Sequence, residues 1–321
     1  MKRKRIILLA AVVGLCVSIL FGWFGPILSV SPFWVTLTRP EIRDVSANLL
    51  LGNRHLYPSS PFLTGLFTPA WNADDMVYGL RALSSHAKAG EQVYYEVYTE
   101  EEQKADPTKK TVGLYCLHGD SSEKKPYILL FAGGGFSSVC TFCESLPVGE
   151  AFCELGYTVF MGSYRLTGVF GQAQDPKILA EDIAREISFI NEHAEEWNLD
   201  TENYMIGGFS AGSWTAATWC DPRYGYEAYS MEKPAVYCSM YGIVEDYIDY
   251  TEVPAFIRFC KNDQYFDDSL VEKYSAALTE KGIPCDFRIV NCLHGFGLGT
   301  GTEAEGWVHE AEAFWESVQN S

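Results

Sequence analysis

The sequence predicts an α/β fold in which a mostly parallel sheet of eight strands is covered by helices on both faces. Eight apolar runs rich in β-branched and aromatic residues follow one another between residues 92 and 292. Segments of helical length separate most of the later runs, and this alternation is typical of a parallel sheet buried on both sides. The chain has 321 residues, of which 47% are hydrophobic and 21% charged, enough for one large domain of this class.

The expected strands can be placed in chain order. They are Gln92–Tyr98, Thr111–His118, Tyr127–Ala132, Tyr157–Ser163, Tyr204–Gly208, Ala235–Tyr241, Ala255–Cys260 and Asp286–Cys292. A polar stretch, Glu100–Lys110, joins the first two, so we expect these two to form an antiparallel pair. The remaining connections favour parallel pairing.

Helices are expected where apolar residues recur at helical spacing. The clearest segment is Asp175–Trp197, in which Asp175 can cap the helix and Pro176 suits its first position. One apolar face of this helix is formed by Leu179, Ile183, Ile187 and Ile190. Two further helices are predicted at Leu270–Lys281 and Ala304–Val318, and Asp74 and Asp75 can start a short one that runs through Leu83.

The most informative motif follows the fifth expected strand. It reads Gly208-Phe209-Ser210-Ala211-Gly212 and leads into a helix-like segment, Trp214–Trp219. Glycines two residues before and after a serine let the strand and helix approach closely and leave the serine Oγ exposed. Ser210 is therefore a candidate nucleophile for attack on a carbonyl carbon, provided that a base and an oxyanion hole lie nearby.

A run of three glycines follows the third expected strand and offers such a hole. Gly133-Gly134-Gly135 leaves backbone N–H groups uncovered by side chains, so they can point at a developing oxyanion together with the N–H of Ala211. A flexible turn or a phosphate loop are the alternatives. A phosphate loop would need a following G-K-[S/T], which is absent here.

The candidate base and acid follow the last two expected strands. His294 lies in a glycine-rich loop after the eighth strand, whereas the other five histidines lie before the sheet, at an early strand end or on helices. Asp263 follows the seventh strand, and Asp267 and Asp268 are competitors for the same role. Asp263 is preferred because it lies closest to the strand end, where ligands of an open α/β sheet bind.

The chain order Ser210, Asp263, His294 is that of the α/β hydrolases. The sequence resembles this superfamily over about residues 90–318, and within it the esterase/lipase branch with a glycine-rich oxyanion loop, which includes acetylesterases and carboxylesterases. The matching pieces are Ala132-Gly133-Gly134-Gly135-Phe136, Gly156-Tyr157, Tyr164-Arg165-Leu166, Asp182, the Ser210 motif, Pro254, Asp263 and His294-Gly295-Phe296-Gly297. The chain departs from the family pattern at Ala132, where histidine or proline is common, and at Cys260, where glycine is usual.

The resemblance implies a catalytic role for each of these residues. Ser210 would be the nucleophile, His294 the base and Asp263 its orienting acid, while Gly134, Gly135 and Ala211 would supply the oxyanion N–H groups. It implies ester hydrolysis through an acyl-enzyme, with no metal and no organic cofactor. A serine peptidase of the same fold and a catalytically silent binding module stay open as alternatives, although residues 25–90 are too few for the large additional domain of such peptidases.

Aromatic residues are dense after the nucleophile and bear on the substrate. They are Trp214, Trp219, Tyr224, Tyr226, Tyr229, Tyr237, Tyr241, Tyr247 and Tyr250. In a cap above the site they could stack on sugars or aryl groups, which would suit an acetylated carbohydrate. Packing in the core is the alternative. The formal net charge of −18 would repel phosphate backbones, so a nucleic-acid partner is not expected.

The N-terminus has the pattern of a membrane anchor. Four basic residues at positions 2–5 precede an uncharged, mostly apolar span, Ile6–Phe24, which is just long enough to cross a bilayer. We expect residues 1–30 to form an uncleaved signal anchor, 31–90 a linker and lead-in, and 91–321 the catalytic domain outside the cytoplasm. Secretion after cleavage is the alternative. The oligomeric state is not predicted.

Ten cysteines are present, and nine remain once Cys16 in the expected anchor is set aside. Because nine is odd, at least one is free or pairs with another molecule. Cys140 and Cys143 form a C-x-x-C pair, but no second pair or H-x3-H accompanies it. We interpret it as structural, either as thiols or as a local bridge, rather than as a zinc or redox site.

Overall fold

The computed structural model describes residues 39–52 and 70–320. The expected anchor at 6–24 lies outside these ranges, as does most of the expected linker. None of the helices within them combines the length and apolar character that crossing a bilayer requires. Localisation therefore stays a prediction.

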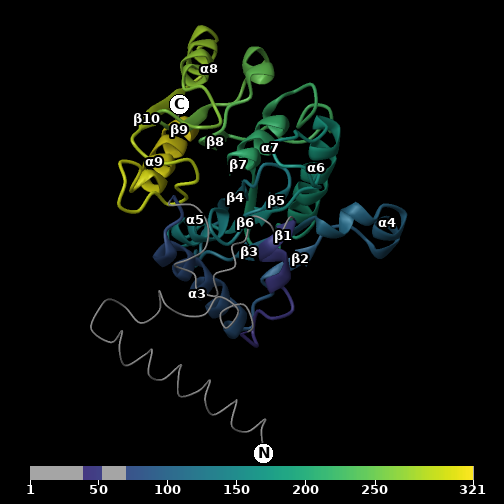
Figure 1. The fold of residues 1–321 in the computed structure, drawn as a ribbon. Coiled ribbons are helices and arrows are strands. Elements are labelled where there is room, and N and C mark those ends of the chain that lie inside the picture. The colour runs from purple at the N-terminus through teal and green to yellow at the C-terminus, as the bar shows by residue number, and fades with distance from the viewer. Residues whose placement is uncertain (1–38, 53–69, 321) are drawn as a thin grey trace, which may run out of the picture.

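An eight-stranded sheet forms the centre of the molecule, in the order β10-β9-β8-β7-β4-β6-β3-β2 (Figure 1). Its strands are β2 (Tyr94–Glu96), β3 (Gly113–Leu117), β4 (Lys125–Phe131), β6 (Val159–Gly162), β7 (Leu199–Phe209), β8 (Val236–Met240), β9 (Ala255–Cys260) and β10 (Cys285–Val290). Strands β10 to β6 in this order pair in parallel, whereas β3 pairs antiparallel with both β6 and β2. The predicted eight strands, their mostly parallel arrangement and the antiparallel first pair are confirmed.

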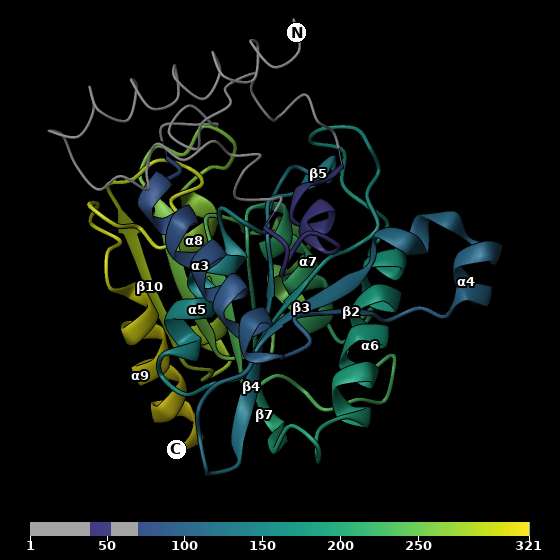
Figure 2. The same cartoon turned by 90° about the horizontal axis from the view of Figure 1, so that it is seen from below.

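Helices cover both faces of the sheet, as Figure 2 shows. One face packs against α6 (Pro176–Glu192), α7 (Ala211–Cys220) and α8 (Ser269–Glu280). The other packs against α3 (Ala73–Ala89), α5 (Ser145–Cys153) and α9 (Trp307–Gln319). The four apolar residues predicted on α6 are all buried, and Asp175 caps that helix by accepting the N–H of Lys177.

Six short elements complete the part of the chain that the structure describes. The expected polar connection between β2 and β3 contains a helix, α4 (Glu100–Ala105), and a 3-10 turn, η4 (Pro107–Thr111). A further 3-10 turn, η5 (Glu245–Tyr250), precedes β9. The segment η1 (Ser46–Leu50) and β1 (Leu51–Gly52) reaches the glycine loop, because β1 pairs with β5 (Ser138–Val139).

Residues 70–90, which the sequence places in the lead-in, contain a helix that packs against the sheet. The short helix expected from Asp74 to Leu83 is α3, which begins after its cap Asn72 and ends at Gly90 in the left-handed region. Met76, Leu80 and Leu83 of α3 are buried in the core on that face. This part of the chain therefore packs as part of the same body as the sheet.

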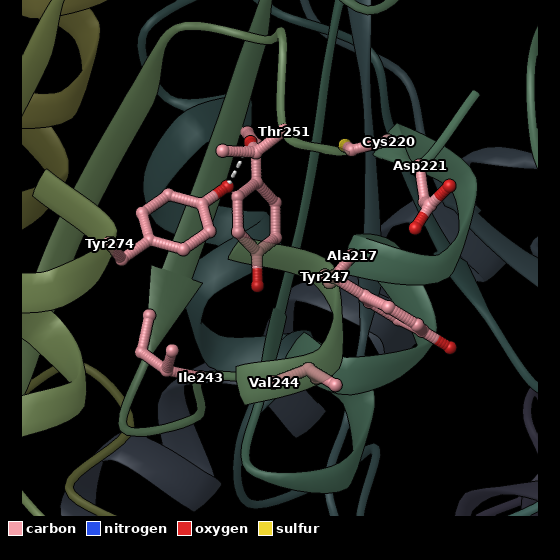
Figure 3. Close-up of a pocket in the computed structure, with 9 residues that line it drawn as sticks. Ala217, Cys220, Asp221, Ile243, Val244, Tyr247, Thr251 and Tyr274 are labelled. Atoms are coloured by element: carbon pink, nitrogen blue, oxygen red, sulfur yellow. Dashed lines mark hydrogen bonds between the residues drawn. The ribbon is translucent and has the colours of Figure 1, made fainter. Parts of the chain in front are cut away.

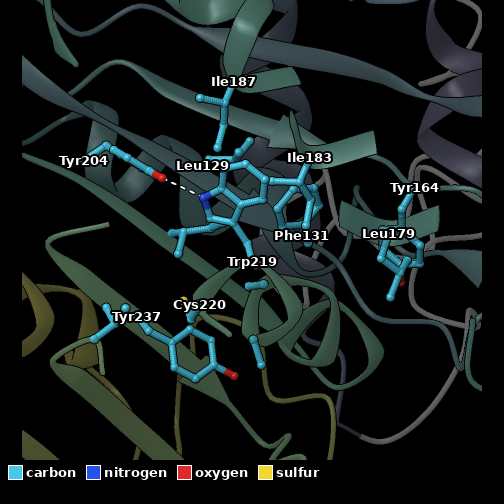
Figure 4. Packing of buried hydrophobic residues seen from close by; sticks show 14 of the residues in the cluster. Leu129, Phe131, Tyr164, Leu179, Ile183, Ile187, Tyr204, Trp219, Cys220 and Tyr237 are labelled. Atoms are coloured by element: carbon cyan, nitrogen blue, oxygen red, sulfur yellow. Dashed lines mark hydrogen bonds between the residues drawn. The ribbon is translucent and has the colours of Figure 1, made fainter. Parts of the chain in front are cut away.

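The core on the α6–α7 face is built around aromatic side chains (Figure 4). Trp219 is fully buried and donates its indole N–H to the hydroxyl of Tyr204 at 2.7 Å. The ring of Tyr204 stacks in turn on Tyr127. Burial of these large rings, with the polar groups of Trp219 and Tyr204 hydrogen-bonded, stabilises β7 and α7, the two elements that carry the nucleophile motif.

Candidate active site

Ser210 lies at the sharp turn between β7 and α7. Its backbone has φ 52° and ψ −118°, a region that L-residues with a side chain rarely adopt, and its N–H donates to the carbonyl of Met240 at 3.0 Å. A side chain at Gly208 would collide with the backbone of Gly212, and one at Gly212 with the carbonyl of Phe131. The two glycines are therefore required for the close approach of α7 to the sheet, and this turn holds Oγ at the carboxyl end of the strands.

His294 joins the candidate nucleophile to the candidate acid. Its Nε2 lies 2.8 Å from Ser210 Oγ, and its Nδ1 lies 2.7 Å from Asp263 Oδ2. With Nδ1–H donated to the carboxylate, Nε2 is free to accept the serine proton. The structure thus brings together the three residues that the sequence singled out.

The acid is held rigidly in its loop. The side chain of Asp263 is fully shielded from solvent, and its second oxygen accepts the backbone N–H groups of Tyr265 and Phe266 at 2.8 and 3.3 Å. The competitor Asp267 instead accepts the N–H of Ser269 at the start of α8. Asp268 is the N-cap residue of the same helix.

The glycine loop faces the same cleft as Ser210. Gly134 and Gly135 have φ values of 133° and 60°, which glycine adopts readily, and both line the cleft together with Ala211 at the first turn of α7. Within the described ranges, the N–H groups of these three residues have no hydrogen-bond partner in the protein. Three unpaired backbone donors therefore belong to residues that line the cleft at Ser210.

Gly133 fits tightly beneath that loop. A methyl group on it would lie 2.7 Å from the carbonyl oxygen of Phe209 and 2.9 Å from Cβ of Ser210. Its carbonyl accepts the N–H of Cys140 at 2.9 Å. This glycine thus sets how closely the loop approaches the nucleophile.

Glu144 is a residue of this site that sequence reasoning missed. It is only 3% exposed, and its Oε2 accepts the N–H of Gly133 at 2.6 Å. Its Oε1 accepts the hydroxyl of Tyr241 at 3.1 Å, and the ring of Tyr241 packs edge-on against His294 with centroids 4.9 Å apart. Glu144 therefore hydrogen-bonds directly to Gly133 of the glycine loop. It contacts the His294 imidazole only indirectly, through the ring of Tyr241.

Burial makes the Glu144 carboxyl a weaker acid than an exposed glutamate. Loss of solvent raises the pKa of its carboxyl to about 7, although the Gly133 N–H, the charge of His294 and the Tyr241 hydroxyl each lower it. Its one signal in the sequence is an acidic residue within the otherwise uncharged run between Phe136 and Gly149.

The cleft at Ser210 has a volume of about 380 Å³ and largely aromatic walls. The aromatic residues that line it are Trp71, Phe136, Phe170, Trp214, Tyr265 and Phe266. Phe170 and Tyr265 stand at its rim, 53% and 54% exposed, with their rings in edge contact at 6.1 Å. Such a cleft suits a small neutral or aryl-bearing ligand.

The aromatic residues that follow the nucleophile are divided between the cleft and the core. Of that group, Trp214 lines the cleft and Tyr241 supports His294. Trp219, Tyr226 and Tyr237 are buried in the core. The packing alternative therefore accounts for these three, and the rim aromatics come from other segments, at 170 and 265–266.

A charged cluster fixes the loop between β6 and α6 that carries Phe170. Arg165 donates through Nε to Asp182 at 2.9 Å and through Nη2 to Glu181 at 2.6 Å. The second oxygen of Asp182 accepts the backbone N–H of Arg165. Asp182, which the resemblance included, thus has a structural partner and lies away from the Ser210 cleft.

A second, much smaller cavity lies beneath α7 (Figure 3). Its volume is about 10 Å³, the space of roughly one water molecule. Tyr274 and Thr251, hydrogen-bonded at 2.6 Å, form part of its wall. It shares no lining residue with the Ser210 cleft and is too small for a substrate.

Within the described ranges, one side-chain group has the spacing of metal ligands. His86, Glu150 and Cys153 lie between α3 and α5, with ligand atoms within 4.8 Å of one another. None of these residues lines the Ser210 cleft. At the C-x-x-C pair, both side chains are buried thiols, and the Cys143 thiol donates to the carbonyl of Cys140 at 3.2 Å.

Comparisons with known proteins agree with this architecture. Residues 114–220 match the family model BD-FAE. Over 97 residues the chain is 35% identical to endo-1,4-beta-xylanase B of Butyrivibrio fibrisolvens; these residues make up 30% of this chain and 15% of the xylanase. The chain thus spans about one seventh of the curated relative that it matches.

Two solved structures illustrate the similarity of fold. An acetyl ester-xyloside bifunctional hydrolase from Caldicellulosiruptor lactoaceticus superimposes with a TM-score of 0.61 at 18% identity, covering 70% of this chain and 96% of its own. A carboxylesterase from Lactobacillus plantarum gives a TM-score of 0.54 at 18% identity, covering 64% and 92%. The chain therefore has the α/β-hydrolase fold, and its residues 114–220 are similar to the BD-FAE family model.

Proposed function

We propose that this protein is a serine esterase that hydrolyses short-chain acyl esters. The observation that carries the proposal is the position of His294, within hydrogen-bond distance of both Ser210 and Asp263. An unpaired set of backbone donors beside Ser210 adds the second requirement of acyl transfer, a place for the oxyanion.

The reaction proceeds in two steps. His294 Nε2 takes the proton of Ser210 as Oγ attacks the ester carbonyl, and the protonated imidazole then gives that proton to the departing alcohol. Asp263 keeps the imidazole in the required tautomer and stabilises its charge. Water then attacks the acyl-enzyme, again with His294 as base, and releases the acid. Each oxyanion donor is worth about 2.7–4 kcal/mol in such a reaction.

The test is Ser210→Ala assayed with p-nitrophenyl acetate, with Ser213→Ala as a matched control. Ser213 lies one turn further along α7, buried and hydrogen-bonded to Tyr237 and Ser239. Loss of at least a thousandfold in kcat for Ser210→Ala alone is expected. Undiminished hydrolysis, or failure of a fluorophosphonate to label Ser210, would overturn the proposal and favour a silent binding module.

We further propose acetylated carbohydrate as the substrate class. Three observations support this: the partial match to a xylanase, the fold shared with an acetyl ester-xyloside hydrolase, and a cleft walled by aromatic rings that can stack on sugars. A panel of p-nitrophenyl acetate, butyrate and octanoate beside acetylated xylan tests it. Release of acetate from xylan supports it; preference for octanoate, or cleavage of peptide amides instead, contradicts it.

The N-terminal segment supports a proposal on location. We propose that residues 6–24 tether the chain to a membrane, with the hydrolase domain outside the cytoplasm, because a basic cluster precedes this apolar span. Cell fractionation of the full chain and of a variant lacking residues 1–30 tests it. Membrane-associated full chain that a membrane-impermeant reagent modifies in intact cells is the expected result. Recovery of both forms in the cytosol would contradict it.

A further inference from the structure

We propose that Cys260 and Cys292 form a disulfide that joins the loop of the acid to the loop of the base. Cys260 is the last residue of β9, three positions before Asp263, and Cys292 stands two positions before His294. Their Sγ atoms lie 2.9 Å apart. Cys260 also stands at the position where the similar hydrolases usually carry glycine. The cysteine at this position lies beside a second cysteine, Cys292.

The backbone explains why the two thiols meet. β9 and β10 pair in parallel with Cys260 opposite Val290. The carbonyl of Val290 accepts the N–H of Lys261 at 2.8 Å and that of Cys292 at 3.1 Å. The second bond closes a three-residue turn, which folds the chain back and returns Cys292 to the end of β9.

The remaining distance is small. A disulfide bond is about 2.04 Å long, so the sulfur atoms need to approach by about 0.9 Å. Neither strand has to leave the sheet for this movement, because Cys260 already holds its ladder position and Cys292 lies on the following turn.

The chemistry requires an oxidant, for which a small-molecule disulfide such as oxidised glutathione suffices. Cys292 is partly exposed, whereas Cys260 is 1% exposed. The hydrogen bond with Cys292 and burial both raise the pKa of the Cys260 thiol. Cys292 is therefore the first nucleophile: its thiolate attacks the small disulfide and releases one thiol. Cys260 then loses its proton to solvent and attacks Cys292 Sγ, releasing the second thiol.

The consequence for the site rests on the proposed function. A bond between residues 260 and 292 limits how far the Asp263 and His294 loops can separate, and so preserves the 2.7 Å contact between carboxylate and imidazole. The cross-link is a positioning element, since neither sulfur lines the cleft. Disulfides persist in oxidising compartments, so the bond is compatible with the location proposed above.

The first experiment is peptide mapping of the full chain. The protein is incubated with oxidised glutathione, free thiols are alkylated without reduction, and the digest is analysed by mass spectrometry. We expect a linked peptide pair that contains Cys260 and Cys292 and that disappears after reduction. Both residues found alkylated after this treatment would overturn the proposal. The result does not depend on any hydrolytic activity.

The second experiment measures the consequence. Cys292→Ser should lower kcat for p-nitrophenyl acetate about fivefold, equivalent to about 1 kcal/mol in the activation barrier, with KM unchanged. Cys285→Ser is the control, because Cys285 begins β10 at its opposite end. Reduction of the wild-type protein should reproduce the loss and leave Cys292→Ser unaffected. A linked peptide with unchanged kcat would refute the positioning role alone, whereas an inactive wild type would refute the proposed function alone.

Discussion

Replacement of Glu144 by Gln separates the charge of this buried carboxyl from its shape. The amide oxygen can still accept the N–H of Gly133, and the side chain still fills the space beneath the oxyanion loop. The group loses its ability to ionise. Because the carboxyl is fully buried and its pKa is raised to about 7, the change should alter how stability depends on pH.

The sign and size follow from proton linkage. Below pH 4.5 the carboxyl is protonated in the folded and the unfolded chain alike. Between pH 4.5 and about 7 the unfolded chain releases this proton while the folded protein keeps it, so the wild-type free energy of unfolding falls as the pH rises. At about 1.4 kcal/mol per pH unit, this loss is about 2.5 kcal/mol between pH 5 and pH 8. Glutamine does not titrate, so the variant does not undergo this loss in the free energy of unfolding.

The measurement is urea unfolding followed by circular dichroism at pH 5, 6, 7 and 8. The free energy of unfolding of Glu144→Gln, relative to wild type, should rise by about 2.5 kcal/mol across this range. Glu280→Gln, at an exposed position on α8, serves as the control and should show no such trend. A difference between variant and wild type that stays constant within about 0.5 kcal/mol from pH 5 to pH 8 would refute the reasoning.

Three further predictions concern the oxyanion loop, the cleft rim and the loop that supports it. Gly133→Ala places a methyl group 2.7 Å from a main-chain oxygen of β7, so kcat should fall about a hundredfold with an unchanged circular dichroism spectrum; a kcat within tenfold of wild type contradicts this. Phe170→Ala and Tyr265→Ala should each raise KM for aryl esters about threefold to tenfold without lowering kcat, and a fall in kcat at constant KM counts against a binding role. Arg165→Met leaves Asp182 buried without its cation, so the free energy of unfolding should drop by about 3–5 kcal/mol in urea; a midpoint equal to that of wild type argues against this.

The central strands were predictable because their burial on both faces produces a continuous run of apolar residues, whereas the edge strands β2 and β10 are partly exposed. The ends of the strands were less predictable. β7 begins at Leu199, five residues before the expected start, since its first half contains the polar residues Asp200 to Asn203 and extends beyond the core. Likewise α3 continues past Leu83 to Ala89, where Ala87 packs against the core and Ser84 hydrogen-bonds to Glu41, a stretch with no repeated apolar pattern.

Two helices were not predicted: α4, within the expected polar connection, and α5. α5 contains Pro147 and Gly149, two residues that weaken a helix, and it is buried almost all round, so that no amphipathic pattern marks it. Glu144 directly precedes this helix, and its two partners lie 11 and 97 residues away in the sequence. A contact of that kind leaves no local signature. By contrast, Ser210, Asp263 and His294 could be singled out from the sequence, because each closely follows the end of a strand and has glycine or polar neighbours.

The strained backbone of Ser210 has a consequence for how the protein loses activity. A φ of 52° at a residue with a side chain is maintained only while α7 remains packed on the end of β4. When that contact loosens, the serine relaxes to an ordinary conformation and its Oγ leaves the imidazole, even though the sheet is still intact. Reactivity should therefore disappear at a lower denaturant concentration than the circular dichroism signal. The rate of fluorophosphonate labelling would then report local opening at this turn well before global unfolding.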